Sequence, residues 1–85
     1  MFSKGRFSQR LLELRQERNE SQEALAEFLH VTRTQISEME NAKKTTTLEK
    51  FVMICEYYNV SADYLLGLTE ERRALKIEAS DEICQ

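Results

Sequence analysis

Four polar side chains lie in the segment RTQISE at a spacing that places them on one surface of a helix. They are Arg33, Thr34, Ser37 and Glu38. An arginine can donate two hydrogen bonds to guanine, a threonine can offer a methyl or hydroxyl group to a base edge, and a carboxylate can accept from cytosine. A serine hydroxyl can both donate and accept. The segment therefore predicts a helix surface with the chemistry for reading base edges in DNA.

An ordinary solvated helix surface is the alternative interpretation of this segment. Glu38 fits a DNA contact least, because phosphates repel a carboxylate. Its expected roles are the rejection of wrong bases or an ion pair with Arg33 or Lys43. The interpretation as a DNA-reading surface depends on the elements that hold the segment.

Those elements are expected to be two short helices joined by a tight turn. Ser21 can cap the first helix, and Thr32 with Gln35 three residues later forms a capping box for the second. Apolar residues recur at helical spacing on one side of each helix and in the turn: Leu25, Ala26, Leu29, Val31, Ile36 and Met39. This pattern predicts that the second helix is held to the core by its apolar side and turns its polar side outward.

The region from Leu11 to Leu66 resembles the helix-turn-helix of the Cro and phage-repressor family of bacterial transcription regulators. The resemblance is carried by RLLELRQERNESQEALAEFL, by QISEMEN and by NVSADYLLGL. It implies a compact five-helix, lambda-repressor-like DNA-binding domain. It also implies that Arg15 and Glu40 form a partly buried ion pair with a structural role beneath the second helix of the motif.

Five residues around the motif are expected to contact DNA phosphates and so to position the module. The resemblance implies this role for Gln22, at the start of the first motif helix. Thr32 and Asn41 are polar residues at the two ends of the second helix, and Lys43 and Lys44 follow it. The lysines are expected to carry most of the salt dependence of binding.

Three positions depart from the pattern of the resembled family. His30 and Ala42 stand where that family usually or often has glycine, and Glu20 stands where an apolar residue is common. We expect a left-handed backbone at His30, which costs a residue other than glycine about 1 kcal/mol. The loops are therefore expected to differ in detail while the fold stays the same.

The chain of 85 residues predicts one small all-α domain. It has no proline and two glycines, so strand-and-turn architectures would lack their usual turn residues. Helices are expected over residues 7–18, 22–29, 33–40, 48–58 and 62–67, with caps at Ser21, Thr32, Thr47 and Ser61 and a stop at Gly67. Their inward-facing residues are expected to be Leu11, Leu14, Arg15, Leu48, Phe51, Ile54, Cys55, Tyr58, Val60, Tyr64 and Leu65.

The net charge of -3 is unfavourable for DNA binding, but the charges are unevenly distributed. Residues 1–50 carry 9 basic and 8 acidic side chains, whereas residues 51–85 carry 3 and 7. We therefore expect a local positive stripe on an acidic body. Its expected members beside Lys43 and Lys44 are Lys4, Arg6, Arg10 and Arg18.

Catalytic, metal-binding and membrane-spanning signals are weak in this sequence. Cys55, Cys84 and the single histidine form neither a CxxC motif nor a Cys/His cluster with ligand spacing. No nucleophile and base pair stands out. No apolar run approaches the about 20 residues that a membrane-spanning helix needs. We expect a cytoplasmic protein that is no enzyme and binds no metal and no cofactor.

The function that these features predict is sequence-specific binding of double-stranded DNA by a transcription regulator, expected to be a repressor that binds an inverted-repeat operator as a homodimer. The DNA-binding domain is expected over residues 1–68, and residues 69–85 form a charged tail, either frayed or a weak helix. Contacts between copies are expected at Leu66, Leu68 and Leu75. The alternative is a protein-interaction module on the same scaffold, antitoxin-like or anti-repressor, with the acidic second half as its interface.

Overall fold

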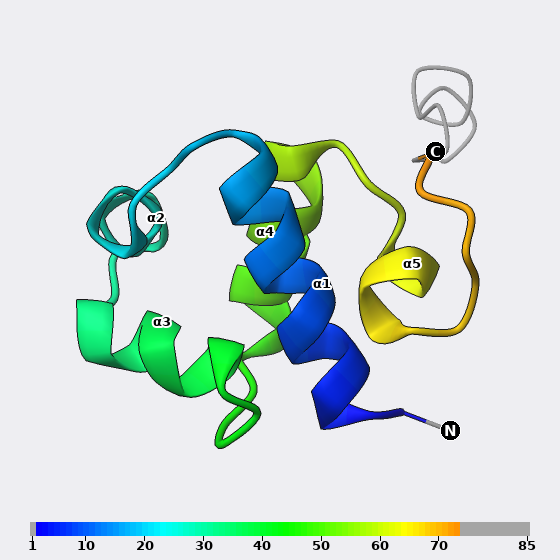
Figure 1. Ribbon diagram of the computed structural model, residues 1–85, viewed down its shortest axis with the longest axis horizontal. Coiled ribbons are helices and arrows are strands. Elements are labelled where there is room, and N and C mark those ends of the chain that lie inside the picture. The colour runs from blue at the N-terminus through cyan, green and yellow to red at the C-terminus, as the bar shows by residue number, and fades with distance from the viewer. Residues whose placement is uncertain (1, 74–85) are drawn as a thin grey trace, which may run out of the picture.

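The computed structural model describes residues 2–73, which form five α-helices. They are α1 (Lys4–Glu17), α2 (Gln22–Leu29), α3 (Arg33–Glu40), α4 (Leu48–Tyr58) and α5 (Ala62–Leu66). Figure 1 shows α2 and α3 at one side of the molecule, α5 with the last described residues at the other, and α1 with α4 between them. The all-α class expected from the sequence is confirmed.

Side-chain oxygens cap the beginning of each helix. The expected caps of α2 to α5 are confirmed, because each side chain accepts a hydrogen bond from the backbone N–H three residues later: Ser21, Thr32, Thr47 and Ser61. The expected start of the first helix at residue 7 is wrong. Ser3 accepts from the N–H of Arg6, and this cap lets α1 begin at Lys4. Gly67 ends α5 with a φ of 84°, in the left-handed region that favours glycine.

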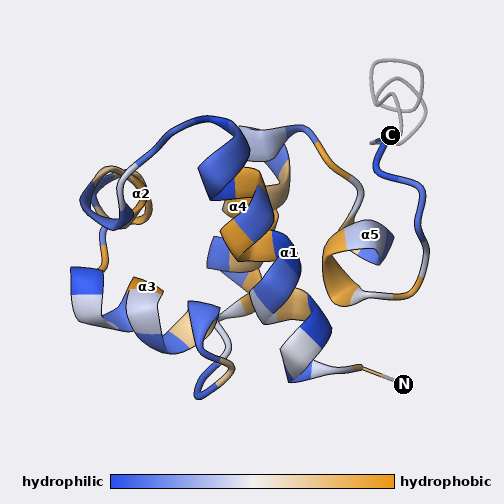
Figure 2. Ribbon diagram, in the orientation of Figure 1, coloured by the Kyte–Doolittle hydropathy of each residue, from blue (hydrophilic) through white to orange (hydrophobic). Residues whose placement is uncertain are grey.

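The core is one cluster of buried apolar side chains contributed by all five helices. Figure 2 shows hydrophobic and hydrophilic residues alternating along α1 and α4, as expected for helices with one buried side. The fully buried larger side chains are Phe7, Leu11, Leu25, Leu29, Ile36, Ile54 and Leu65. Leu48 was expected among them, and this expectation is wrong because its side chain is 77% exposed. It is the first residue of α4, which enters the core only from Phe51 onward.

Two turns of the helix-turn-helix region use a left-handed backbone without glycine. His30, which ends α2, has a φ of 59°, as expected, and its N–H donates to the carbonyls of Ala26 and Glu27. Ala42, just after α3, has a φ of 60°. Both positions therefore adopt the conformation for which glycine is the usual residue.

Residues 69–73 run back along the domain. The buried Arg10 donates from Nη1 to the carbonyls of Tyr64 and Thr69, both at 2.6 Å, and pairs with Glu70 at 3.1 Å. Further along, Arg72 donates to both carboxylate oxygens of Glu17, at 2.6 and 2.9 Å. This segment is therefore held against α1 and α5.

The remaining residues of the expected tail, 74–85, lie outside the described part of the chain, and with them Leu75 and Cys84. Cys55 is half-buried on α4, where desolvation raises the pKa of its thiol to about 11. None of the helices in residues 2–73 is long and apolar enough to cross a membrane.

Candidate nucleic-acid interface

The surface of α3 is divided as the sequence predicts, with one apolar side in the core and a polar side toward solvent. Ile36 is fully buried and Met39 is 3% exposed, so both anchor the helix. Arg33 and Thr34, at the N-terminal end of α3, are exposed. The other two expected base readers, Ser37 and Glu38, are half-buried. The outermost part of the surface is therefore its first turn.

The start of α3 is fixed by a reciprocal cap. Thr32 Oγ1 accepts from the N–H of Gln35 at 3.1 Å, and Gln35 Oε1 accepts from the N–H of Thr32 at 2.9 Å. Two backbone donors are satisfied in this way at the end that carries Arg33. The hydroxyl of Thr32, an expected phosphate contact, is thus engaged within the protein.

Beneath α3, Arg15 and Glu40 meet in an ion pair with two hydrogen bonds. Arg15 Nε lies 2.6 Å from Glu40 Oε2, and Nη2 lies 3.0 Å from Oε1. The Glu40 side chain is 4% exposed and the Arg15 side chain 13%. The hydrogen bond to Glu40, outweighing desolvation, raises the pKa of Arg15 above its ordinary value. The structure thus brings the two residues together between α1 and the end of α3.

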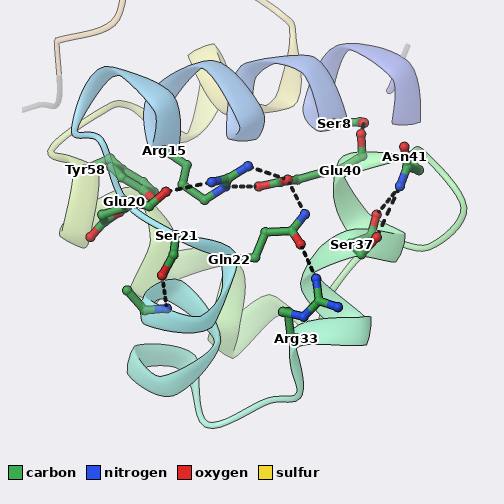
Figure 3. Close-up of polar contacts among 11 residues, drawn as sticks. Ser8, Arg15, Glu20, Ser21, Gln22, Arg33, Ser37, Glu40, Asn41 and Tyr58 are labelled. Atoms are coloured by element: carbon green, nitrogen blue, oxygen red, sulfur yellow. Dashed lines mark hydrogen bonds and ion pairs between the residues drawn. The ribbon is translucent and has the colours of Figure 1, made fainter.

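Gln22 joins this ion pair to the exposed surface of α3. Its Nε2 donates to Glu40 Oε1 at 2.9 Å, and its Oε1 accepts from Arg33 Nη1 at 3.1 Å. Figure 3 shows this line of bonds running from Arg15 through Glu40 and Gln22 to Arg33. The side chain expected to contact phosphate therefore has two partners inside the protein. Arg33 also approaches the exposed Glu23 at 3.7 Å, a pair that solvent screens.

The end of α3 is closed by Asn41. Its side-chain Nδ2 donates to the carbonyl of Ser37 at 2.8 Å and lies 3.3 Å from the Ser37 hydroxyl (Figure 3). Asn41, an expected phosphate contact, and Ser37, an expected base reader, are thus paired with each other. Both side chains are therefore partly engaged within the protein.

Lys43 and Lys44 follow α3 and are exposed. Their backbone N–H groups donate to the carbonyl of Glu38, at 2.9 and 3.3 Å, which fixes the loop to α3. Neither lysine side chain, nor that of Glu38, forms an ion pair among residues 2–73. A shallow groove of about 310 Å³ lies between α3 and the start of α4, and Glu38, Lys44 and Lys50 line it. The loop therefore presents positive charge next to the polar surface of α3.

Three arginines were expected to extend this positive charge, and for them the expectation is wrong because their side chains bind elsewhere in the protein. Arg10 is buried against residues 64–70, as described above. Arg6 donates to the carbonyl of Gly67 at 3.3 Å. The Arg18 guanidinium lies over the rings of Tyr57 and Tyr58, 5.2 and 5.0 Å from their centroids. The positive charge around α3 therefore comes mainly from residues 33, 43, 44 and 50.

One polar cluster near the motif was missed by the sequence interpretation. Tyr58 donates to Glu20 Oε1 at 2.8 Å, and Tyr57 donates to Glu20 Oε2. Figure 3 shows Glu20 and Tyr58 beside Arg15, at the end of the line of bonds that reaches α3. Burial and the hydrogen bond to Glu20 raise the pKa of Tyr58. The signal in the sequence was Glu20 itself, a carboxylate at a position where the resembled family is commonly apolar.

The described residues contain no group of three or more histidine, cysteine, aspartate or glutamate side chains that could hold a metal ion. Their polar groups on the surface of α3 and in the loop after it are arginine, lysine, hydroxyl and amide groups, together with the carboxylate of Glu38. This set suits hydrogen bonding to base edges and phosphates.

Comparison with known proteins places this geometry in a family. Residues 11–65 match the family model described as Helix-turn-helix. The uncharacterized HTH-type transcriptional regulator YobD of Bacillus subtilis (strain 168) is 35% identical over 65 residues, which cover 76% of this chain and 58% of YobD. The HTH-type transcriptional activator BcrR of Enterococcus faecalis is 40% identical over 61 residues, which cover 72% of this chain and 30% of BcrR. The chain thus spans only part of the length of either relative.

A solved structure shares the fold. The restriction-modification controller protein C.AhdI from Aeromonas hydrophila aligns with a TM-score of 0.65 and 26% identity, over 73% of this chain and 94% of C.AhdI. Because the family match covers most of the chain and includes both helices of the motif, α2 and α3, this protein belongs to the helix-turn-helix family.

Proposed function

We propose that the chain is a sequence-specific DNA-binding transcription regulator in which α3 enters the major groove. The observation that carries the proposal is the divided surface of α3, with Ile36 and Met39 buried and Arg33 and Thr34 exposed at the capped N-terminal end. In this architecture the N-terminal residues of the second motif helix meet base edges. Arg33 is assigned to a guanine and Thr34 to a thymine or another base edge.

Ser37 and Glu38 are assigned to the inner part of the same surface. Both are half-buried, so they reach bases only where α3 lies deep in the groove. Glu38 forms no ion pair within the described residues, so its carboxylate remains available to accept from cytosine or to reject other bases.

Phosphate contacts are assigned first to Lys43 and Lys44, whose side chains are exposed beside α3. Thr32 and Asn41 already use their side chains to close the two ends of α3, and they reach phosphate with the capacity that remains. Gln22 has partners in Glu40 and Arg33, so its first role in this proposal is to align Arg33. A phosphate contact by Gln22 is compatible with that role, because an amide offers two donors and two lone pairs.

Two copies are proposed to bind one operator with an inverted repeat, since a single short helix reads only a few base pairs. Half-sites one duplex turn apart, about 34 Å, would place both copies on one side of the DNA. Leu68, 55% exposed after α5, and the half-buried Leu66 are available for contact between the copies. Occupation of an operator that overlaps a promoter would repress transcription. The relatives named above include a transcriptional activator and a controller protein. In this proposal, the position of the operator relative to the promoter decides whether binding represses or activates transcription.

Selection from a pool of random duplexes tests the proposal. The expected result is recovery of one inverted repeat with two half-sites about one helical turn apart, bound more weakly as salt rises. Recovery of no preferred sequence, with binding no tighter than that of an unrelated acidic protein, would contradict it. That result would favour the protein-interaction module instead.

A further inference from the structure

Glu20 lies in the loop between α1 and α2 and holds two tyrosines of α4 with one carboxylate. Tyr58 donates to Oε1 at 2.8 Å and Tyr57 donates to Oε2, so each oxygen has a phenol partner. The ring of Tyr57 stacks on Phe28 of α2, with centroids 4.2 Å apart. The Arg18 guanidinium lies over both tyrosine rings. The carboxylate therefore has a fixed position between α2 and α4.

The backbone of the same residue holds Arg15. The carbonyl oxygen of Glu20 accepts from Arg15 Nη1 at 2.6 Å. The other two donor atoms of that guanidinium, Nε and Nη2, bind Glu40. All three nitrogens of Arg15 are therefore engaged, and a movement of the Glu20 backbone would displace the group that orients Glu40.

Glu40 passes this orientation to the exposed surface. Its Oε1 accepts from Gln22 Nε2, and Gln22 Oε1 in turn accepts from Arg33 Nη1. The Arg33 side chain is 59% exposed, so without such a partner its long stem would sample many rotamers. A side chain that is already oriented loses less entropy when it meets a base.

We infer that Glu20 is a positioning residue for base reading. The tyrosines of α4 fix its carboxylate, its carbonyl fixes Arg15, and the bonds through Glu40 and Gln22 present Arg33 to DNA in one orientation. This inference rests on the proposed reading of DNA by α3. It adds that the affinity and base preference of Arg33 depend on three residues that do not touch DNA: Glu20, Tyr57 and Tyr58.

Three variants separate positioning from simple stabilisation. Glu20→Leu removes the carboxylate and substitutes the kind of residue common in the resembled family. The double variant Tyr57→Phe with Tyr58→Phe removes only the two hydroxyls and keeps the ring contacts with Phe28 and Arg18. The matched control is Tyr64→Phe, which removes a phenol that accepts from Arg72 Nε at 3.1 Å on the α5 side of the molecule.

Each variant is made with and without Arg33→Ala and is studied well below its melting temperature. The experiment measures its affinity for the selected operator and for operators changed at one base pair at a time. The expected result is a loss of about threefold to tenfold on the selected operator, which lies within the range for coupling through packed and hydrogen-bonded side chains. The preference should relax at the base pair that Arg33 reads. Both effects should vanish in the Arg33→Ala background, because a double-mutant cycle isolates the shared contribution. Tyr64→Phe should leave affinity and preference unchanged, even where it lowers the melting temperature.

The inference would be overturned if the Glu20 and tyrosine variants melted at lower temperatures but kept the affinity and base preference of the wild-type protein. The cluster would then have a purely structural role. Losses that add to that of Arg33→Ala would overturn the inference as well. In both cases the wild-type protein still selects an operator, so the proposed function would stand. A wild-type protein that selects no sequence would overturn both.

Discussion

Arg15 and Glu40 are joined by two hydrogen bonds, of 2.6 and 3.0 Å, while the Glu40 side chain is only 4% exposed. A pair this far from solvent contributes little net stability, because desolvation offsets the attraction. Removal of one member is different, since the other is left charged and without its partner. The pair therefore holds α3 against α1, because separating the two helices would leave a buried charge without its partner.

Glu40→Ala should lower the free energy of unfolding by about 3 kcal/mol, the low end of the range for a broken buried pair, because Arg15 remains partly exposed. Glu38→Ala is the matched control, since Glu38 lies on the same helix and forms no ion pair among the described residues. Thermal melting followed by circular dichroism compares the two. Equal small shifts would contradict the structural role of the pair.

Lys43→Ala should weaken binding to all sequences almost equally, because a contact with phosphate carries no base information. The slope of log K against log salt concentration should shrink by roughly 1 unit. Fluorescence anisotropy at several salt concentrations measures the slope. Arg73→Ala, which removes an exposed basic side chain in the segment after α5, should change it much less. A loss confined to the selected operator would mean that Lys43 reads bases.

Ala42→Gly should stabilise the protein by about 0.5 to 1 kcal/mol, because relief of the left-handed strain at a φ of 60° exceeds the entropy that glycine adds to the unfolded chain. Ala24→Gly is the matched control in the first turn of α2, where the backbone is helical and the same substitution should destabilise the protein. Urea unfolding of both variants compares the signs. Destabilisation by both would show that the turn after α3 is not left-handed.

The complex with the selected operator should contain two copies of the protein. Sedimentation equilibrium measures its mass, and a duplex with only one half-site provides the control, which should bind a single copy. Cooperative binding of the second copy would follow from contacts near Leu66 and Leu68. One copy bound to a full-length site without an inverted repeat would rule out the dimer.

The local features of the fold could be predicted from the sequence because their physical causes are local. Ser21 and Thr32 cap their helices through bonds to residues three positions later. The left-handed turn at His30 likewise depends on the end of its own helix. The periodic apolar residues of α2 and α3 indicated the buried sides correctly.

The destinations of long polar side chains could not be predicted in this way. Arg10 bonds to the carbonyls of Tyr64 and Thr69, which are 54 and 59 positions away in the chain. Glu20 meets Tyr58 across 38 positions. Such partners are chosen by the packing of whole helices, so the sequence indicated only that these residues were polar or out of pattern. For the same reason, only the structure shows that Gln22 binds Glu40 and Arg33.

Arg33→Ala is the most direct test of DNA reading by α3. Affinity for the selected operator should fall by about 1 to 3 kcal/mol, and preference should relax at one base pair. Arg73→Ala is the control, since Arg73 is also an exposed arginine but follows α5 and bridges to Val60, away from α3 in the chain. It should change neither quantity beyond a small, sequence-independent loss. Unchanged affinity and unchanged base preference of Arg33→Ala would show that α3 does not read DNA through this side chain.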